Sequence, residues 1–220
     1  CYDDVFDLLL KNIKLKSFAI SGTPGIGKSL FFVYILHRLM KDFSEKTLSL
    51  IPNRIIYHSA IEYTCFNLEN QTVFKLDSLE ASLLVRLQDT LYIIDGQTTP
   101  MSSSCITLFI SSPRSKQYKE FVKQKSAKQW YFPVWTLDEL LACQSKCYPE
   151  LSIEILKERY GVYGGVARFV FDKNVPTTME EALADVDAVS GVRNIGIPTR
   201  IFTTTHTLLH LIVSNDGKFQ

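Results

Sequence analysis

A glycine-rich segment near the start of the chain carries residue types that bind phosphate. Residues 22–29 read Gly-Thr-Pro-Gly-Ile-Gly-Lys-Ser and fit the P-loop pattern G-x-x-x-x-G-K-[ST] at every fixed position. In this pattern backbone N–H groups converge on phosphate oxygens, and the N-terminus of the following helix adds positive potential. We expect Lys28 to reach the β- and γ-phosphates of ATP and the Ser29 hydroxyl to ligate Mg²⁺; the alternative is a glycine-rich turn with a solvated lysine. The predicted nucleotide-binding residues are Gly22, Thr23, Pro24, Gly25, Ile26, Gly27, Lys28 and Ser29.

The second candidate for chemistry is a carboxylate that follows an apolar run. Residues 91–94 predict a buried strand, and Asp95 stands at its C-terminal end, where ligands bind in open α/β sheets. We expect Asp95 to hold Mg²⁺ through water, which is the Walker-B role. Lys28 and Asp95 are 67 positions apart with at least one strand between them, which suits NTPases that insert another strand between these two motifs. A plain turn at Asp95 and Gly96 is the alternative.

The residues after Asp95 predict slow hydrolysis. Many ATPases of this type carry Glu directly after the Walker-B Asp to orient the attacking water, and here that position is Gly96. The next polar residue is Gln97, and Gln orients water in some GTPases. We therefore expect ATP to be bound tightly and hydrolysed slowly.

Two further polar positions resemble the sensor elements of related ATPases. The apolar residues 106–110 lead into Ser111, Ser112 and Arg114, as in a sensor-1 strand whose polar group faces the γ-phosphate. A glycine pair shortly before Arg168 is similar to the sensor-2 element of a helical lid. A strand-terminating turn and a helix C-cap with a surface arginine are the respective alternatives. The predicted catalytic residues are Lys28, Asp95, Ser112 and Arg168.

Strands that alternate with helices are needed to position these residues. Continuous apolar strands separated by helical segments imply parallel pairing in a sheet covered on both faces. The expected fold is α/β: a P-loop NTPase (AAA/ASCE-like) parallel sheet flanked by helices, with a C-terminal helical lid. Strands are expected at 17–21, 54–59, 91–94, 105–110 and 130–134, a hairpin at 62–66 and 73–76, and helices at 28–41, 79–87, 115–128, 137–147 and 153–160.

The strand pattern fades after residue 136, which predicts a change of domain. We expect an α/β core at 1–136, a helical lid at 137–175 and the start of a further region at 176–220. In that last region, residues 177–181 offer a capping box for a helix to about residue 189.

Composition excludes several other classes of protein. Apolar residues make up 46% of the chain and charged residues 21%, which predicts a folded chain and not a disordered one. The net charge of +1 creates no overall positive potential that would attract nucleic acid or anionic membranes. No run of 18 uncharged apolar residues predicts a membrane span. Lysines at 116, 119, 123, 125 and 128 lie in one predicted helix. A solvated helix face is the default interpretation, with nucleic-acid contact as the weaker alternative.

The cysteines favour a reducing intracellular compartment. The chain has five of them, an odd number spread over its whole length. Cys143 and Cys147 are four apart, as are His206 and His210, and a zinc site would use such pairs. Both pairs lie in apolar runs, so we expect the cysteines to be small buried residues instead.

The order of the motifs resembles a known family. The motifs are the loop at 22–29, Tyr-Ile-Ile-Asp at 92–95, Ser-Pro-Arg at 112–114, Pro-Val-Trp at 133–135 and Gly-Gly-Val-Ala-Arg at 164–168. This series is similar to the P-loop domain of Crinkler-type effectors and of retrotransposon hot spot (RHS) proteins, over roughly residues 15–171. The resemblance implies an AAA-like ATP-binding domain, often fused to a variable effector domain such as a nuclease. For Crinklers it also implies secretion into a host cell and its nucleus.

The sequence thus predicts a Mg²⁺-dependent ATP-binding module with slow hydrolysis, from a Crinkler/RHS-like effector. One alternative is a nucleotide-gated interaction switch with little turnover. Another is a nucleic-acid-directed effector in which the ATPase drives a domain outside this sequence. The expected partners are ATP and either further copies of the chain or an effector target protein, but no membrane. Because the sequence begins with Cys1 and not Met, we expect a piece of a longer protein.

Overall fold

The chain divides into two compact units. The computed structural model describes residues 2–11, 16–45, 52–60, 62–96, 98–113 and 115–172. One unit comprises residues 1–21 and 28–131, and we call it the sheet unit. The other comprises residues 22–27 and those from 132 onward, and we call it the helical unit. The glycine-rich loop at 22–27 therefore belongs to the helical unit, whereas Lys28 and Ser29, which follow it in the chain, belong to the sheet unit.

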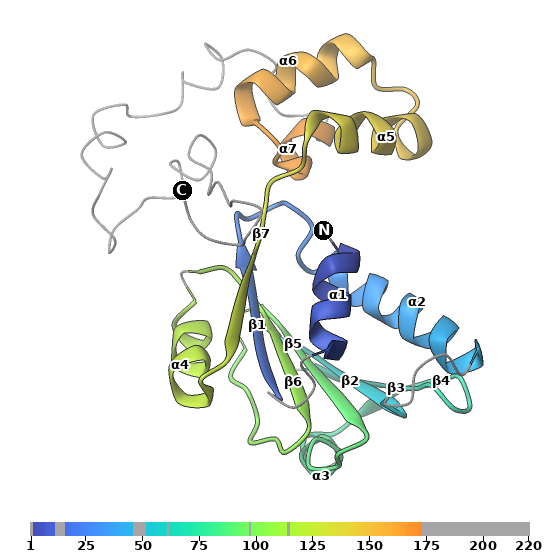
Figure 1. The fold of residues 1–220 in the computed structure, drawn as a ribbon, viewed down its shortest axis with the longest axis vertical. Helices are drawn as coiled ribbons and strands as arrows, with labels where there is room; N and C mark the ends of the chain where they lie inside the picture. The colour runs from blue at the N-terminus through green and yellow to red at the C-terminus, as the bar shows by residue number, and fades with distance from the viewer. Residues whose placement is uncertain are drawn as a thin grey trace. The chain divides into compact units, whose positions relative to one another are not determined.

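The sheet has seven strands in the order β4-β3-β2-β5-β6-β1-β7 (Figure 1). The strands are β1 (Ser17–Gly22), β2 (Arg54–Ser59), β3 (Glu62–Asn67), β4 (Thr72–Leu76), β5 (Thr90–Asp95), β6 (Ile106–Ile110) and β7 (Lys128–Phe132). Neighbours β2, β5, β6 and β1 pair in parallel, whereas β2, β3 and β4 form an antiparallel meander. The predicted α/β class and the hairpin are confirmed, and β6 lies between β1 and β5 as the motif spacing predicted.

Helices cover both faces of this sheet. The four helices are α1 (Tyr2–Lys11), α2 (Leu30–Glu45), α3 (Ser78–Leu84) and α4 (Lys116–Lys125). On β2, the ring of Tyr57 stacks on Phe32 of α2, whereas its neighbour Ile56 is buried in a cluster with Tyr118 and Phe121 of α4. Successive strand residues point to opposite faces, so α2 and α4 lie on opposite sides of the sheet (Figure 1). Helix α1 contacts α2.

Several elements differ from the sequence predictions. Helix α1 was not predicted. Helix α4 ends at Lys125 because Ser126 adopts a left-handed conformation (φ 47°) and donates its backbone N–H to Val122. Strand β7 consequently begins at Lys128, which was predicted to lie in the helix. Helix α2 begins two residues later than predicted, at Leu30, and runs on to Glu45.

The described part of the helical unit consists of three short helices around a small core. Helices α5 (Leu137–Cys147), α6 (Ile153–Tyr163) and α7 (Ala167–Phe171) bury Leu140, Leu156 and Val170 against one another. The Thr136 side chain caps α5 in a capping box, and the Ser152 side chain caps α6. The bounds of α5 match the prediction, α6 continues to Tyr163, and α7 was not predicted. The predicted helix from residue 177 and the region 176–220 lie outside the described residues.

Candidate functional site

Asp95 lies at the C-terminal end of β5, where it is held between two hydroxyl groups. In the parallel ladder it is paired with Ser59 of β2 on one side and Ile110 of β6 on the other. The Ser29 hydroxyl donates to Asp95 Oδ1 at 3.1 Å, and the Tyr57 hydroxyl donates to Asp95 Oδ2 at 2.8 Å. Two residues that the sequence predicted as metal ligands, 66 positions apart, are therefore in direct contact. A hydroxyl and a carboxylate are the hard oxygen donors that Mg²⁺ prefers, so the residues present fit this ion.

Tyr57 was missed by sequence reasoning. Its ring stacks on Phe32 with centroids 4.0 Å apart and an interplanar angle of 19°. Burial, and secondarily the hydrogen bond to Asp95, raise the pKa of Tyr57 to about 12. The phenol therefore keeps its proton at neutral pH and acts as a donor. Only the pairing register of β2 against β5 brings Tyr57 beside Asp95, and no local sequence pattern carries that information.

The loop at 22–27 is held at its backbone carbonyls by donors within the helical unit. The Trp135 indole Nε1–H donates to the carbonyl oxygen of Ile26 at 2.8 Å. The backbone N–H of Arg168, in the first turn of α7, donates to the carbonyl oxygen of Gly25 at 3.0 Å. Gly25 has a φ of +86°, and a β-carbon there would lie 2.9 Å from Cβ of Arg168. The helical unit thus fixes the shape of the loop from two sides.

Two motifs of the predicted family meet at this loop. The backbone N–H of Trp135 donates to the carbonyl of Gly165 at 2.8 Å. A β-carbon at Gly165 would lie 1.8 Å from the Trp135 carbonyl oxygen and 2.5 Å from its nitrogen, so no side chain fits. The Pro-x-Trp and Gly-Gly-x-x-Arg motifs therefore form one backbone clasp, by which we mean Trp135, Gly165 and Arg168 together with the loop carbonyls they hold. Sequence reasoning used Trp135 only as a mark of resemblance and missed this role.

The remaining predicted residues fall in different surroundings. Lys28 is half-buried and directly follows the loop. Ser111 is buried at the end of β6, where its N–H donates to Ile20 of β1. Ser112 is half-buried, and its carbonyl accepts from Ser115 at the start of α4, so the backbone turn predicted as the alternative is present. The Arg168 side chain is exposed on α7. Gln97 and Arg114 lie outside the described residues.

Gly96 continues the ladder after Asp95 in a conformation that favours glycine. Its φ is +92°, in the left-handed half of conformational space, and its N–H donates to the Ile110 carbonyl at 2.9 Å. The pairing with β6 thus extends one residue past Asp95.

Cys65 and Cys105 are buried, whereas the two cysteines of α5, which were predicted to be buried, are not. On α5 the core side is occupied by Leu140 and Gln144, which leaves Cys147 exposed and Cys143 half-buried. Their thiols interact along one helical turn; burial first, and then Cys147, raise the pKa of Cys143. No cluster of three or more His, Cys, Asp or Glu side chains suited to a metal occurs in the described part of the chain, and His206 and His210 lie outside it.

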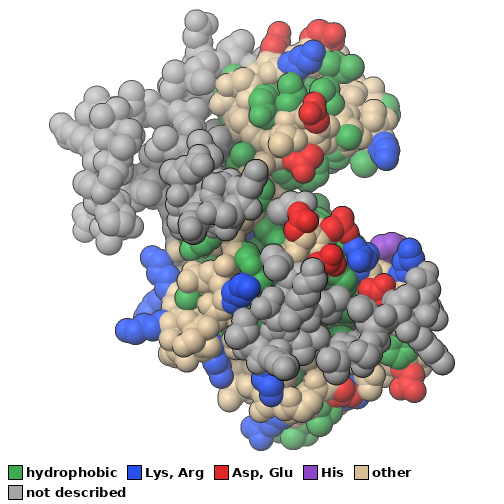
Figure 2. All heavy atoms as spheres, viewed as in Figure 1, with side chains coloured by type: hydrophobic (Ala, Val, Ile, Leu, Met, Phe, Trp, Pro, Cys, Tyr) green, Lys and Arg blue, Asp and Glu red, His purple; other side chains and the backbone are tan. Residues whose placement is uncertain are grey.

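The basic face is smaller than predicted. Four exposed lysines line α4, and one of them, Lys116, approaches Glu120 at 3.8 Å. Lys128, on β7, instead lies over the Trp130 ring at 5.6 Å. Figure 2 shows Lys and Arg side chains gathered on the α4 side of the sheet unit. Within the described ranges, no helix is long and apolar enough to cross a bilayer.

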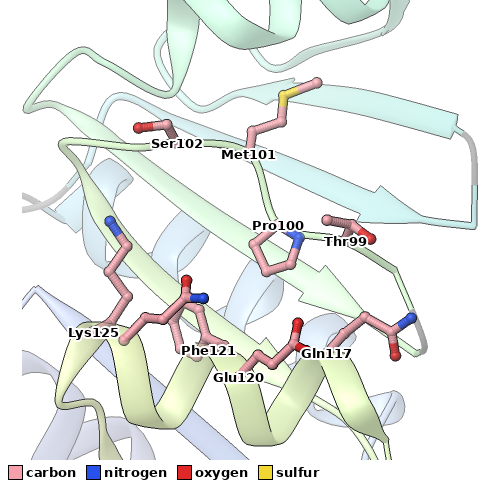
Figure 3. A pocket seen from close by; sticks show the side chains of 9 residues that line it. Thr99, Pro100, Met101, Ser102, Gln117, Glu120, Phe121 and Lys125 are labelled. Carbon is pink, nitrogen blue, oxygen red and sulfur yellow. The ribbon is translucent and has the colours of Figure 1, made fainter.

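A cavity of about 340 Å³ lies elsewhere on the sheet unit, between the segment before β6 and α4 (Figure 3). Met101 and Phe121 supply apolar lining, and Gln117, Glu120 and Lys125 border it. Its size falls at the lower end of small-molecule sites. None of its lining residues is among the predicted nucleotide-binding residues, so it is separate from the candidate site.

Comparison with known proteins identifies relatives. A stretch of 163 residues, 72% of this chain, is 31% identical to Crinkler effector protein 15 of Phytophthora infestans. Crinkler effector protein 16 of the same organism matches with the same identity and coverage. The chain is thus similar to a part of these Crinkler effector proteins. It spans about a quarter of the length of these relatives (25%). The Crinkler resemblance predicted from the motifs is confirmed, no family model matches the chain, and the P-loop NTPase assignment stays a prediction.

Proposed function

We propose that this chain is an ATP-binding module that binds nucleotide with Mg²⁺ and hydrolyses it slowly. The observation that carries the proposal is the hydrogen bond between Ser29 and Asp95, at 3.1 Å. A serine directly after the P-loop lysine and a carboxylate at the end of a buried strand are the pair that holds the metal in P-loop NTPases. The placement of β6 between β1 and β5 supports the same assignment.

Each residue has a distinct role in this proposal. The backbone N–H groups of the loop at 22–27 cradle the phosphates, and Lys28 neutralises charge on the β- and γ-phosphates. Ser29 ligates Mg²⁺ directly and Asp95 through water. When bound, Mg²⁺ supplies charge neutralisation at the β- and γ-oxygens. The backbone clasp keeps the loop in shape, and Arg168 is the candidate to reach the γ-phosphate.

Gly96 favours slow turnover over rapid hydrolysis. No carboxylate follows Asp95 to orient water, and an arginine supplied by a second chain is worth 10³–10⁵ in rate in related enzymes. The second candidate function, a nucleotide-gated interaction switch, rests on this same observation. Effector activity on a target is also a proposal for this chain, supported by the word effector in the names of its relatives. Entry into a host cell is a proposal that rests on the resemblance to Crinklers alone.

A binding titration tests the proposal. Lys28→Ala should weaken binding of a labelled ATP analogue by about 30-fold to several thousand-fold, since a desolvated charge loses its partner. Asp95→Asn should weaken binding with Mg²⁺ and leave binding in EDTA unchanged. Lys119→Ala, at an exposed lysine of α4, is the matched control and should bind like wild type. Equal affinity of wild type and Lys28→Ala would reject the site, and phosphate release by the same proteins separates a slow ATPase from a switch.

A further inference from the structure

Tyr57 contacts Asp95 but belongs to neither of the nucleotide-binding motifs. It lies on β2, and Ser59, two residues further along the same face, is the ladder partner of Asp95. The phenol oxygen is 2.8 Å from Asp95 Oδ2, while Ser29 occupies Oδ1. Each carboxylate oxygen therefore has its own hydroxyl donor, and the two donors come from different elements.

We infer that Tyr57 is a positioning residue for Asp95: its phenol holds Oδ2, so that Oδ1 is the oxygen presented to Ser29 and to the hydrated metal. This inference rests on the proposed ATP-binding function. The ligand class is a divalent cation with an oxygen shell, accompanied by a nucleoside triphosphate. The hydrogen bond from Ser29 to Asp95 can give way when the metal binds, because the serine hydroxyl can then act as a metal ligand instead of a donor.

The environment of Tyr57 suits it to a fixed donor. Stacking on Phe32, at 4.0 Å between centroids, restrains the ring. Phe32 is on α2, the helix that starts directly after Ser29, and it also contacts Phe66 of β3. The stacked ring places the phenol 2.8 Å from Asp95 Oδ2, a distance at which a phenol donates to a carboxylate.

Tyr57→Phe isolates this role, because it keeps the ring and its stacking and removes only the hydroxyl. We measure the affinity of a labelled ATP analogue across a series of Mg²⁺ concentrations and in EDTA. The Mg²⁺ midpoint is the concentration that gives half of the full increase in affinity. It should rise by about 3- to 10-fold in Tyr57→Phe, which corresponds to the loss of one hydrogen bond. Affinity in EDTA should be unchanged. Tyr63→Phe, on the adjacent strand β3, is the matched control and should leave the Mg²⁺ midpoint at its wild-type value.

The outcomes separate this inference from the proposed function. A wild-type chain that does not bind the analogue rejects the proposed function. Wild-type binding that Mg²⁺ strengthens, with an unchanged midpoint in Tyr57→Phe, overturns the role of Tyr57 alone. An equal loss in EDTA also overturns it, because Tyr57 is then purely structural. If circular dichroism shows that Tyr57→Phe is unfolded, Phe32→Leu tests the inference instead. This variant keeps the Tyr57 hydroxyl but removes the ring on which Tyr57 stacks. It should raise the Mg²⁺ midpoint by a smaller factor than loss of the hydroxyl, and an unchanged midpoint would overturn the inference.

Discussion

The carboxylate site of the sheet unit and the backbone clasp of the helical unit are held by different kinds of interaction. Asp95 is bound by two side-chain hydroxyls, and a mutation can remove either hydroxyl without changing the backbone. The loop at 22–27 is bound through its carbonyls, and Gly165 lies so close to Trp135 that a β-carbon has no room. The Asp95 contacts can change when a ligand binds, whereas the clasp, closed by backbone hydrogen bonds and the Trp135 indole, has no free space at Gly165. The two regions should therefore fail in different ways when they are mutated.

Gly165→Ala should have the largest effect, and it should act on the helical unit. A β-carbon 1.8 Å from the Trp135 carbonyl oxygen forces backbone apart from backbone, which no rotamer change relieves. We expect a loss of at least about 3 kcal/mol in the free energy of unfolding, at the upper end of overpacking effects. Chemical denaturation followed by circular dichroism measures it.

Gly161→Ala is the matched control for that change. Gly161 lies inside α6, and a β-carbon there meets no atom within 4 Å. Alanine should raise the free energy of unfolding by up to about 1 kcal/mol through helix propensity. Similar losses in both variants would show that the close approach of Gly165 to Trp135 does not hold the clasp.

Acid should weaken the sheet unit through His58. This side chain is 2% exposed on β2, and its Nδ1 is 2.7 Å from the Tyr92 hydroxyl. Burial lowers its pKa from 6.5 to about 4, although a hydrogen bond with the Ala60 backbone opposes the shift. The unfolded chain therefore binds the proton more readily, so stability is complete above pH 6.5 and falls as pH drops toward 4. The loss across that window should reach about 3 kcal/mol.

The measurement for His58 is a series of denaturation curves between pH 4 and pH 7. His58→Gln should show a shallower decline with acid than wild type, because the variant cannot take up this proton. Parallel declines in the two proteins would show that other groups account for the pH dependence.

Trp135→Phe should have the smallest effect and should sharpen the contrast between the two regions. It removes the indole N–H donated to Ile26 and keeps an aromatic ring, so the loss of stability should be about 1 kcal/mol. Nucleotide affinity should fall equally with Mg²⁺ and in EDTA, since the loop is disturbed and Asp95 is not. A selective change in the Mg²⁺ midpoint would contradict this separation.

The sequence predicted the parts of the structure that depend on local patterns. The apolar strands, the hairpin and the bounds of α5 follow from residues close together in the chain. Helix α1 was missed although Val5, Phe6 and Leu9 repeat at helical spacing and are buried. The β7 boundary was misplaced because it depends on the left-handed conformation of Ser126.

The candidate site was predictable only in part. The loop, Ser29 and Asp95 come from motifs with fixed spacing, and the structure brings Ser29 and Asp95 together. Tyr57 depends on the register of two strands 36 residues apart in the chain, β2 at Arg54 and β5 at Thr90. The fit of Gly165 against Trp135 depends on how two segments pack. The sequence does not show that a side chain at residue 165 would have no room.

If the chain hydrolyses ATP as proposed, the backbone at Gly96 restricts how it can be engineered toward faster turnover. A β-carbon at this position meets no atom within 4 Å, so there is room for a larger side chain. The obstacle is the torsion, because at φ +92° a glutamate would cost about 1–3 kcal/mol in backbone strain. The carboxylate that many ATPases place here would therefore come at a cost in stability. Under the proposed function, a faster variant would have to accept this strain or recruit its catalytic group from another chain.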